Sequence, residues 1–268
     1  GLGSLAGSAT LGLLIPPSII MIVYGVAADV SIAKLFVAGI LPGLLLMAIF
    51  SGYIVLWSLA NRERMPRETE RTPLRERIAL GRFMLPAVAL IVVVIGSIYG
   101  GYATPTEAAA LGVLGALALS WMSGSLTFRS FADGLMGAML PSTMILFIVA
   151  GAAVLTAALG FTGVPRALVG WVSGLELSPT GLLIVLTIVF IVMGCFIDGI
   201  SMVVLTAAVL LPVVQAAGID LVWFGIYLVL VVELSMITPP VGFNLFVLQG
   251  MTGRSIGTIA AATFPFFL

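Results

Sequence analysis

The stretch Thr10-Leu-Gly-Leu-Leu-Ile-Pro16-Pro17-Ser18 decides how the rest of the chain is interpreted. It interrupts an apolar run that would otherwise form one membrane helix. Two consecutive prolines remove two backbone donors and bias the preceding residues away from helical angles. In hydrocarbon, each backbone group left without a partner costs several kcal/mol unless protein, water or an ion satisfies it. The sequence therefore predicts a broken helix, with a half-helix on each side of residues 10–18.

A second break is predicted far downstream, at Ile237-Thr238-Pro239-Pro240-Val241-Gly242. In secondary transporters, broken helices bind substrate and coupling ions near the middle of the membrane. Two breaks in one membrane chain therefore indicate transport. The alternative is purely structural: each proline pair only kinks a helix, and nearby hydroxyls bond back to their own helical turn.

The composition is that of a membrane protein. Of 268 residues, 61% are hydrophobic and 8% are charged, and the mean hydropathy is +1.28. Charged residues make up about a quarter of a typical soluble domain, and about 20 apolar residues suffice to cross a bilayer as a helix. We therefore expect an all-α polytopic membrane protein embedded in a lipid bilayer. The net charge of zero gives no reason to expect a nucleic-acid partner, and the absence of histidine excludes histidine-based catalysis and metal sites.

Residues 178–216 predict a re-entrant hairpin, favoured over one continuous crossing plus a stub. Two apolar arms of about 15 residues flank Gly194-Cys-Phe-Ile-Asp198-Gly199-Ile-Ser201, and each is too short to cross comfortably. An acid at membrane depth is a functional candidate. Asp198 has an equally simple alternative role, as the N-cap of the second arm. Elsewhere, Thr104 and Glu107 form a capping-box pattern that opens a helix over residues 105–121.

The distribution of basic residues predicts the orientation. Residues 61–82 hold seven of the eleven basic residues, which places this loop in the cytoplasm. Helical segments are expected at 31–60, 78–100, 105–121, 128–138, 141–160 and 164–172. Counting crossings from the loop, with the hairpin entering and leaving on the outside, puts Arg166 outside and Arg254 inside.

An internal repeat supports this count. Pro42 follows Pro16 by 26 residues, and Pro265 follows Pro239 by the same 26 residues. The two copies cross the membrane in opposite directions, which is the inverted-topology plan of many secondary transporters.

The two breaks and the hairpin tip supply candidate ligands for Na⁺, because a small hard cation can be held by neutral carbonyl and hydroxyl oxygens. The helix that starts after each break carries partial positive charge at its N-terminus, which suits an anionic substrate. The Na⁺ candidates, several through backbone carbonyls, are Thr10, Gly12, Ser18, Cys195, Asp198, Gly199, Ser235, Thr238 and Gly242. The substrate candidates are Ser8, Pro17, Ser18 and Asn244. Glu233, one turn before the second break, could pair with a helix terminus or a polar neighbour.

Five stretches, in order, resemble a known family across the whole chain. They are Thr-Leu-Gly-x-x-Ile-Pro-Pro-Ser at 10–18, which continues to Tyr24-Gly25, Thr-Pro-Thr-Glu-Ala-Ala-Ala at 104–110, Gly-x-Phe-x-Asp at 194–198, Gly-Ile-Asp-x-x-Trp-Phe-Gly at 218–225, and Ile-Thr-Pro-Pro-Val-Gly-x-Asn-Leu-Phe-Val at 237–247. Together they closely resemble the large membrane (permease) subunit of tripartite ATP-independent periplasmic (TRAP) transporters. Many family members have proline after the tip aspartate, whereas this chain has Gly199.

The resemblance implies a transporter subunit, not an enzyme. It would drive Na⁺-coupled uptake of a small organic anion, such as a dicarboxylate or sialic acid, by an elevator mechanism in a bacterial or archaeal cytoplasmic (inner) membrane. Implied partners are a small four-helix membrane subunit and a periplasmic substrate-binding protein. Family Na⁺ sites lie where hairpin tips meet broken helices. An ion channel and a non-transporting structural subunit remain the alternatives.

The resemblance also implies a division of the chain. The chain begins with Gly1 and ends in an apolar run, so we expect a fragment, the C-terminal two-thirds of the subunit, that lacks the scaffold region and first hairpin. The expected parts are a broken helix in the transport domain (1–30), a scaffold helix and arm (31–60), the cytoplasmic loop (61–82), scaffold helices and a connecting arm (83–177), the hairpin and second broken helix in the transport domain (178–251), and the start of a last helix (252–268).

Overall fold

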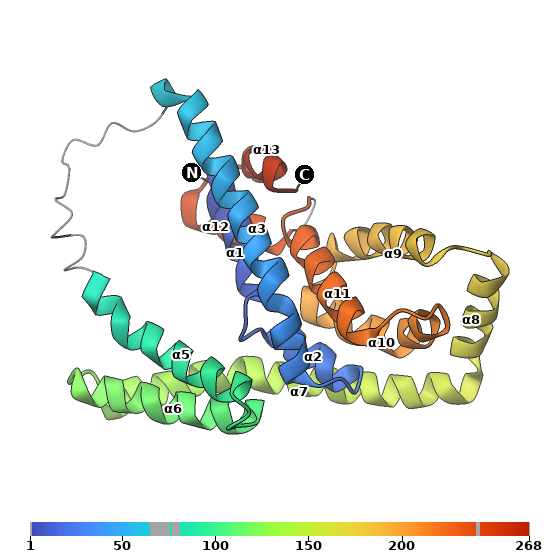
Figure 1. The fold of residues 1–268 in the computed structure, drawn as a ribbon, viewed down its shortest axis with the longest axis horizontal. Helices are drawn as coiled ribbons and strands as arrows, with labels where there is room; N and C mark the ends of the chain where they lie inside the picture. The colour runs from blue at the N-terminus through green and yellow to red at the C-terminus, as the bar shows by residue number, and fades with distance from the viewer. Residues whose placement is uncertain (1, 65–75, 77–80, 240–241, 268) are drawn as a thin grey trace. The chain divides into compact units, whose positions relative to one another are not determined.

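A computed structural model describes residues 2–64, 76, 81–239 and 242–267, and these residues form helices and no strand (Figure 1). Within this part of the chain, three helices are long and apolar enough to cross a membrane, or up to five spans if each bent helix pair counts as one. The expected all-α, multi-pass membrane fold is confirmed. The helices are α1 (Leu2–Leu14), α2 (Ile19–Ala27), α3 (Ile32–Ala60), α5 (Leu85–Tyr99), α6 (Pro105–Met122), α7 (Phe128–Thr162), α8 (Val164–Gly174), α9 (Pro179–Gly194), α10 (Gly199–Ala216), α11 (Leu221–Met236), α12 (Phe243–Thr252) and α13 (Ile256–Phe267), with short 3₁₀ turns η1 (Arg62–Arg64) and η2 (Arg82–Met84).

The chain forms two compact units, which are described separately. The first unit comprises Gly1–Ile54 and Thr143–Leu268, and the second comprises Val55–Ser142. In the second unit α5 packs on α6, where Gly115 lies so close to Leu90 that a Cβ atom there would meet its Cδ1 at 2.4 Å. The Thr104 side chain caps α6 and Glu107 bonds back to the Thr104 amide, so the predicted capping box is present.

In the first unit, α1 and α11 connect the elements of the predicted site. The helix α1 packs on α11, α12 and α13, and α11 also packs on α2, α9 and α10. Small residues allow the backbones to approach closely, as in other membrane helix pairs. A Cβ atom at Gly3 of α1 would lie 1.9 Å from the Ala262 carbonyl oxygen of α13. This packing brings the two predicted broken helices together.

The first break is present but shorter than predicted. The helix α1 continues to Leu14, and the bend to α2 is 41°. The prediction that residues 10–14 belong to the break is therefore wrong, and Thr10 and Gly12 lie inside α1. The helix persists up to the prolines because a proline removes only its own N–H. The N–H groups of the preceding turn bond to carbonyls further toward the N-terminus, so the proline leaves these bonds intact. The Ile15 amide still bonds to the Leu11 carbonyl at 2.9 Å.

Two segment predictions are also corrected. Residues 128–138 and 141–160, expected as separate segments, form the single helix α7 with Pro141 inside it. The span expected at 78–100 begins as α5 at Leu85, and residues 78–80 lie outside the described residues. The two arms of the predicted hairpin are present as α9 and α10, joined by residues 195–198 (Figure 1). Both copies of the proposed repeat place proline inside the following helix, Pro42 in α3 and Pro265 in α13.

Candidate functional site

The tip of the hairpin lies directly against the second break. The Cys195 Sγ donates a hydrogen bond to the Pro239 carbonyl oxygen at 3.2 Å. Gly194 lies so close to α11 that a Cβ atom there would be 2.1 Å from the Ser235 Cβ. Only glycine allows this approach, so the last turn of α9 and the last turn of α11 form a tight seam. We call this contact of Gly194 and Cys195 with Ser235 and Pro239 the tip seam.

The other side of the tip lies against the helix that follows the first break. A Cβ atom at Gly199 would meet Val232 Cγ1 of α11 at 2.4 Å and Ile20 Cδ1 of α2 at 3.1 Å. The structure therefore brings the start of α10 to both α11 and α2. Three segments that the sequence singled out separately, the hairpin tip and the two breaks, meet in one region of the first unit.

Backbone carbonyls gather at the second break. Gly242 has a positive φ of 33°. A Cβ atom at Gly242 would lie 2.8 Å from the carbonyl oxygen of Thr238 and 3.1 Å from the carbonyl oxygen of Met236. Met236 is the last residue of α11 and Thr238 lies two residues beyond it, so no further turn of the same helix is available to bond these carbonyls. Carbonyl oxygens that converge in this way are ligands suited to a small hard cation.

The hydroxyls near the second break bond back to their own helix. Ser235 Oγ donates to the Val232 carbonyl at 2.7 Å, and Thr238 Oγ1 donates to the Leu234 carbonyl at 2.6 Å. A hydroxyl oxygen that donates still has lone pairs available to a cation. The residues Pro240 and Val241 of the predicted break lie outside the described residues.

At the first break, Ser18 is the polar residue that organises the turn. It is buried, caps α2 by accepting from the Met21 amide at 3.3 Å, and donates to the Leu13 carbonyl. The Thr10 hydroxyl bonds back to Gly7 at 2.8 Å inside α1. Ser8 and Pro17 are exposed, and Gly12 has no atom of another element near its missing Cβ.

Asp198 is the N-cap of α10, as its alternative interpretation predicted. One carboxylate oxygen accepts from the amides of Ile200 and Ser201, at 3.0 and 3.1 Å, and the other accepts from the Ser201 hydroxyl at 2.5 Å. Both oxygens are therefore used locally. Asp198 fixes the point at which the hairpin turns into α10, and this fixed turn positions Gly199 against its neighbours.

Two side chains near the breaks have buried polar atoms without a hydrogen-bond partner among the described residues. The amide nitrogen of Asn244, in the first turn of α12, has no hydrogen-bond partner among the described residues. Neither carboxylate oxygen of Glu233 has a hydrogen bond of normal geometry among the described residues, although the carboxyl group lies near the backbone of Leu14 at the end of α1. Unsatisfied buried polar atoms are rare in folded proteins and often mark functional positions.

The contact that joins α2 to α11 was missed by sequence reasoning. The Tyr24 hydroxyl donates to the Leu221 carbonyl at 2.7 Å, and the Tyr24 ring covers Gly225, whose missing Cβ would be 2.5 Å from the ring. A similar contact joins α9 to α11, where the Tyr227 hydroxyl donates to the Leu183 carbonyl at 2.9 Å. A large aromatic residue in one motif and a glycine in another were the available signals, but sequence does not show which pairs meet.

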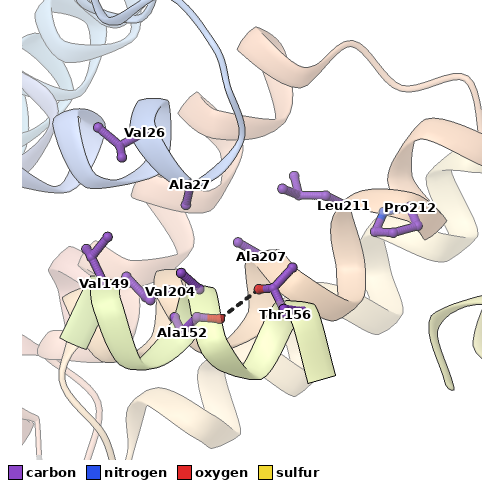
Figure 2. A pocket seen from close by; sticks show the side chains of 11 residues that line it. Val26, Ala27, Val149, Ala152, Thr156, Val204, Ala207, Leu211 and Pro212 are labelled. Atoms are coloured by element: carbon purple, nitrogen blue, oxygen red, sulfur yellow. Dashed lines mark hydrogen bonds between the residues drawn. The ribbon is translucent and has the colours of Figure 1, made fainter. Parts of the chain in front are cut away.

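The first unit also contains an apolar cavity of about 610 Å³ between α2, α7 and α10 (Figure 2). It is lined by Val26, Ala27, Val149, Ala152, Ala153, Thr156, Ala157, Val204, Ala207, Leu211 and Pro212. The one hydroxyl among these side chains, on Thr156, is bonded to the Ala152 carbonyl at 2.8 Å (Figure 2). No side chain in this lining can orient a charged substrate, and none of the predicted site residues belongs to it.

Comparison with protein families identifies the chain. A family model described as "Tripartite ATP-independent periplasmic transporter, DctM component" matches residues 2–268. The chain belongs to the DctM family. The resemblance found in the five motifs is thereby confirmed, and the DctM family is one of transporter components and not of enzymes.

Curated DctM relatives align with almost the whole chain. The C4-dicarboxylate TRAP transporter large permease protein of Pseudomonas aeruginosa is 36% identical, over 100% of this chain and 62% of its own length. The ectoine/5-hydroxyectoine TRAP transporter large permease protein of Ruegeria pomeroyi is 35% identical, again over 100% of this chain and 62% of its own length. The isethionate TRAP transporter permease protein of Oleidesulfovibrio alaskensis is 33% identical, over 97% of this chain and 41% of its own length. The chain thus spans less than two-thirds of these relatives.

Proposed function

We propose that the chain is the part of a TRAP permease that couples Na⁺ entry to uptake of a small organic anion. The observation that carries the proposal is the tip seam beside the second break. There the carbonyls of Met236 and Thr238 converge on Gly242, and Cys195 contacts the carbonyl of Pro239. The Na⁺ ligands that we propose are the carbonyl oxygens of Met236 and Thr238 and the hydroxyl of Thr238. Ser18 is the ligand that we propose from the first break.

An anionic substrate is supported by the donors that face the breaks. Each break is followed by the N-terminus of a helix, α2 or α12, whose first amides favour a negative group. The buried amide of Asn244, which lacks a partner in the described structure, is an additional donor. The relatives named above are described for C4-dicarboxylate, ectoine and isethionate. A carboxylate, including a larger sialic-acid-like one, is the substrate class we propose.

The remaining partners follow from the family description. A component of a tripartite periplasmic transporter works with two others, and we propose a small four-helix membrane subunit and a periplasmic substrate-binding protein. The membrane is the bacterial or archaeal cytoplasmic (inner) membrane. We propose an elevator motion in which the two broken helices and the hairpin move together, because α11 packs on α1, α2, α9, α10 and α12.

The test is substrate uptake by the full-length permease, reconstituted in vesicles with its small subunit and binding protein. Thr238→Ala removes the hydroxyl beside the second break, and we expect a several-fold higher Na⁺ concentration for half-maximal uptake. Thr252→Ala is the matched control, because Thr252 makes the same bond to its own helix, at 2.6 Å to Leu248, at the far end of α12. Na⁺ activation that is unchanged in Thr238→Ala would count against the second break as an ion site. Currents that need no binding protein would instead favour a channel.

A further inference from the structure

The apolar cavity between α2, α7 and α10 is open to the surface of the first unit. Val26 of α2 lines it and is 58% exposed, and Ala153 and Ala157 of α7 line it and are exposed as well. The α2 side chains lie across the cavity from Val149 of α7 (Figure 2). None of the described residues of α7 is buried. The cavity therefore presents an apolar surface that further apolar groups can cover.

A second cavity adjoins the first and contains a basic side chain. It measures about 400 Å³, and Pro212 of α10 lines both cavities, so the two meet at this residue. Gly160 of α7 lines the second cavity and continues the helix face of Val149, Ala153 and Ala157, because steps of three or four residues stay on one face. One face of α7 thus extends from the apolar cavity to the cavity that contains the basic side chain.

That basic side chain is Arg166, in the first turn of α8. It is exposed, and its guanidinium group has no hydrogen bond or ion pair within the described part of the chain. No acidic side chain is among the described residues that line either cavity. The other basic residues of the first unit, Lys34 and Arg254, line neither cavity. Arg166 is therefore available to an anion, and a guanidinium group can bind phosphate through two parallel N–H bonds.

The two cavities together fit a phospholipid better than a water-soluble ligand. Water in a cavity needs polar partners, and the one hydroxyl in the lining of the first cavity, on Thr156, is bonded to the Ala152 carbonyl. In a bilayer, the apolar groups at hand are acyl chains. The volume of about 610 Å³ lies within the range of about 300–1,000 Å³ that is usual for small-molecule sites. The phosphate of a lipid lies at the membrane interface, where the charged ends of long basic side chains also lie.

We propose that these two cavities bind one anionic phospholipid, with an acyl chain in the apolar cavity and the phosphate group at Arg166. The site uses none of the residues that we propose for Na⁺ or for the substrate. Its lining comes from α2, which follows the first break, from α10, the second arm of the hairpin, and from α7. A lipid bound there contacts all three helices and links α7 to the hairpin.

Photo-cross-linking with a phosphatidylglycerol that carries a diazirine in one acyl chain tests the proposal. The full-length permease and its small subunit are reconstituted in phosphatidylcholine vesicles with a trace of this probe, and mass spectrometry identifies the cross-linked peptides. We expect labelling of residues 149–157 and 204–212 to exceed that of α3 several-fold, because the exposed apolar side chains of α3 line neither cavity. A phosphatidylcholine probe with the same chain should show no such preference.

Two pairs of variants test the headgroup and the acyl chain separately. Arg166→Gln removes the charge, and we expect labelling of the cavity to fall to the level of α3, whereas Arg254→Gln, at another exposed arginine of the first unit, should keep it. Ala157→Phe fills the apolar cavity and should also abolish the preference. Ala158→Phe is its control, because Ala158 is exposed on the same helix and lines neither cavity. All four positions are exposed, so these variants are expected to fold.

Four results would overturn the proposal. Wild-type labelling of the cavity no greater than that of α3 would mean that no lipid binds there, as when another protein segment covers it. Labelling that is unchanged in Arg166→Gln, or equal with the phosphatidylcholine probe, would show that no anionic headgroup is bound. Loss of labelling on addition of glycerol 3-phosphate, which has no acyl chain, would assign Arg166 to a soluble anion. The experiment uses neither Na⁺ nor substrate, so its failure is distinguishable from failure of Na⁺-coupled transport.

Discussion

Gly242 has an unusual backbone conformation at the Na⁺ site that we propose. Its positive φ and its position against the Met236 and Thr238 carbonyls leave no room for a side chain. A non-glycine residue in a left-handed conformation costs about 1–2 kcal/mol even without a clash. The carbonyls that we propose as Na⁺ ligands can therefore converge only while position 242 is glycine.

We accordingly expect Gly242→Ala to weaken Na⁺ binding about tenfold or more, since each tenfold change in affinity corresponds to about 1.4 kcal/mol. The measurement is the Na⁺ concentration that half-protects the full-length permease against thermal unfolding. Gly250→Ala is the control, because its missing Cβ has no neighbour within 4 Å and it lies in α12, the helix that Gly242 precedes as N-cap. Equal Na⁺ affinity in both variants would show that Gly242 is not needed for Na⁺ binding.

Asp198 allows a test that separates capping from ion binding. Asparagine caps a helix about as well as aspartate, whereas alanine costs about 0.5–2 kcal/mol at an N-cap. We therefore expect Asp198→Asn to keep both thermal stability and Na⁺ affinity, and Asp198→Ala to lose stability. A large loss of Na⁺ affinity in Asp198→Asn would show that the charge itself binds the ion.

The type of each site residue was easier to predict than its contacts. The capping role of Asp198 and the presence of both breaks followed from local chemistry that sequence carries. Thr10 and Gly12 were wrongly placed in the first break, because the effect of a proline on the preceding turn is limited to a few backbone groups. Gly194 approaches Ser235 closely, although the two residues are far apart in the chain. A single sequence does not show which distant residues are in contact.

At the scale of elements, the tip seam depends on how closely α9 can approach α11. Gly194→Ala would place a Cβ atom 2.1 Å from that of Ser235, so the hairpin must move away. We expect this variant to lose uptake and to lose thermal stability by about 1–3 kcal/mol, the usual cost of overpacking. Gly181→Ala, in the first turns of the same helix, has its nearest contact at 3.4 Å and is the control. Full uptake in Gly194→Ala would show that the tip seam is not needed.

Element boundaries were predicted with mixed success, for reasons specific to each. The helix α6 was found because its capping box is encoded in four consecutive residues. The helix α7 was divided at Pro141, although a proline removes one hydrogen bond and a helix can continue through it. The pairing of α1 with α13 depends on glycine contacts between distant segments, which periodicity does not show.

For the whole molecule, the membrane orientation predicted from basic residues is testable with single cysteines. In a cysteine-free full-length permease, we expect Glu63→Cys and Arg254→Cys to react with a membrane-impermeant thiol reagent only from the cytoplasmic side. Arg166→Cys should react only from the periplasmic side. The Arg254 position is decisive, since labelling from the periplasm would mean that the hairpin is a full crossing and not re-entrant.

The division of the chain into transport and scaffold parts stays a prediction at this scale. The family and the all-helical membrane fold were accessible from sequence, because hydropathy and five ordered motifs extend over the whole chain. The solute was not accessible, because relatives of similar identity are named for C4-dicarboxylate, ectoine and isethionate. Overall similarity therefore does not indicate the solute.

The hydrogen bond from Cys195 to Pro239 gives the chain an intrinsic vibrational reporter. Cys195 is the only cysteine in the sequence, and its thiol bonds to a carbonyl of the second break. The S–H stretch of a thiol lies in a spectral window nearly free of other protein absorption, and it shifts when the thiol loses its acceptor. Separation of the hairpin from the broken helix could thus be followed in real time, without a dye, a spin label or a mutation.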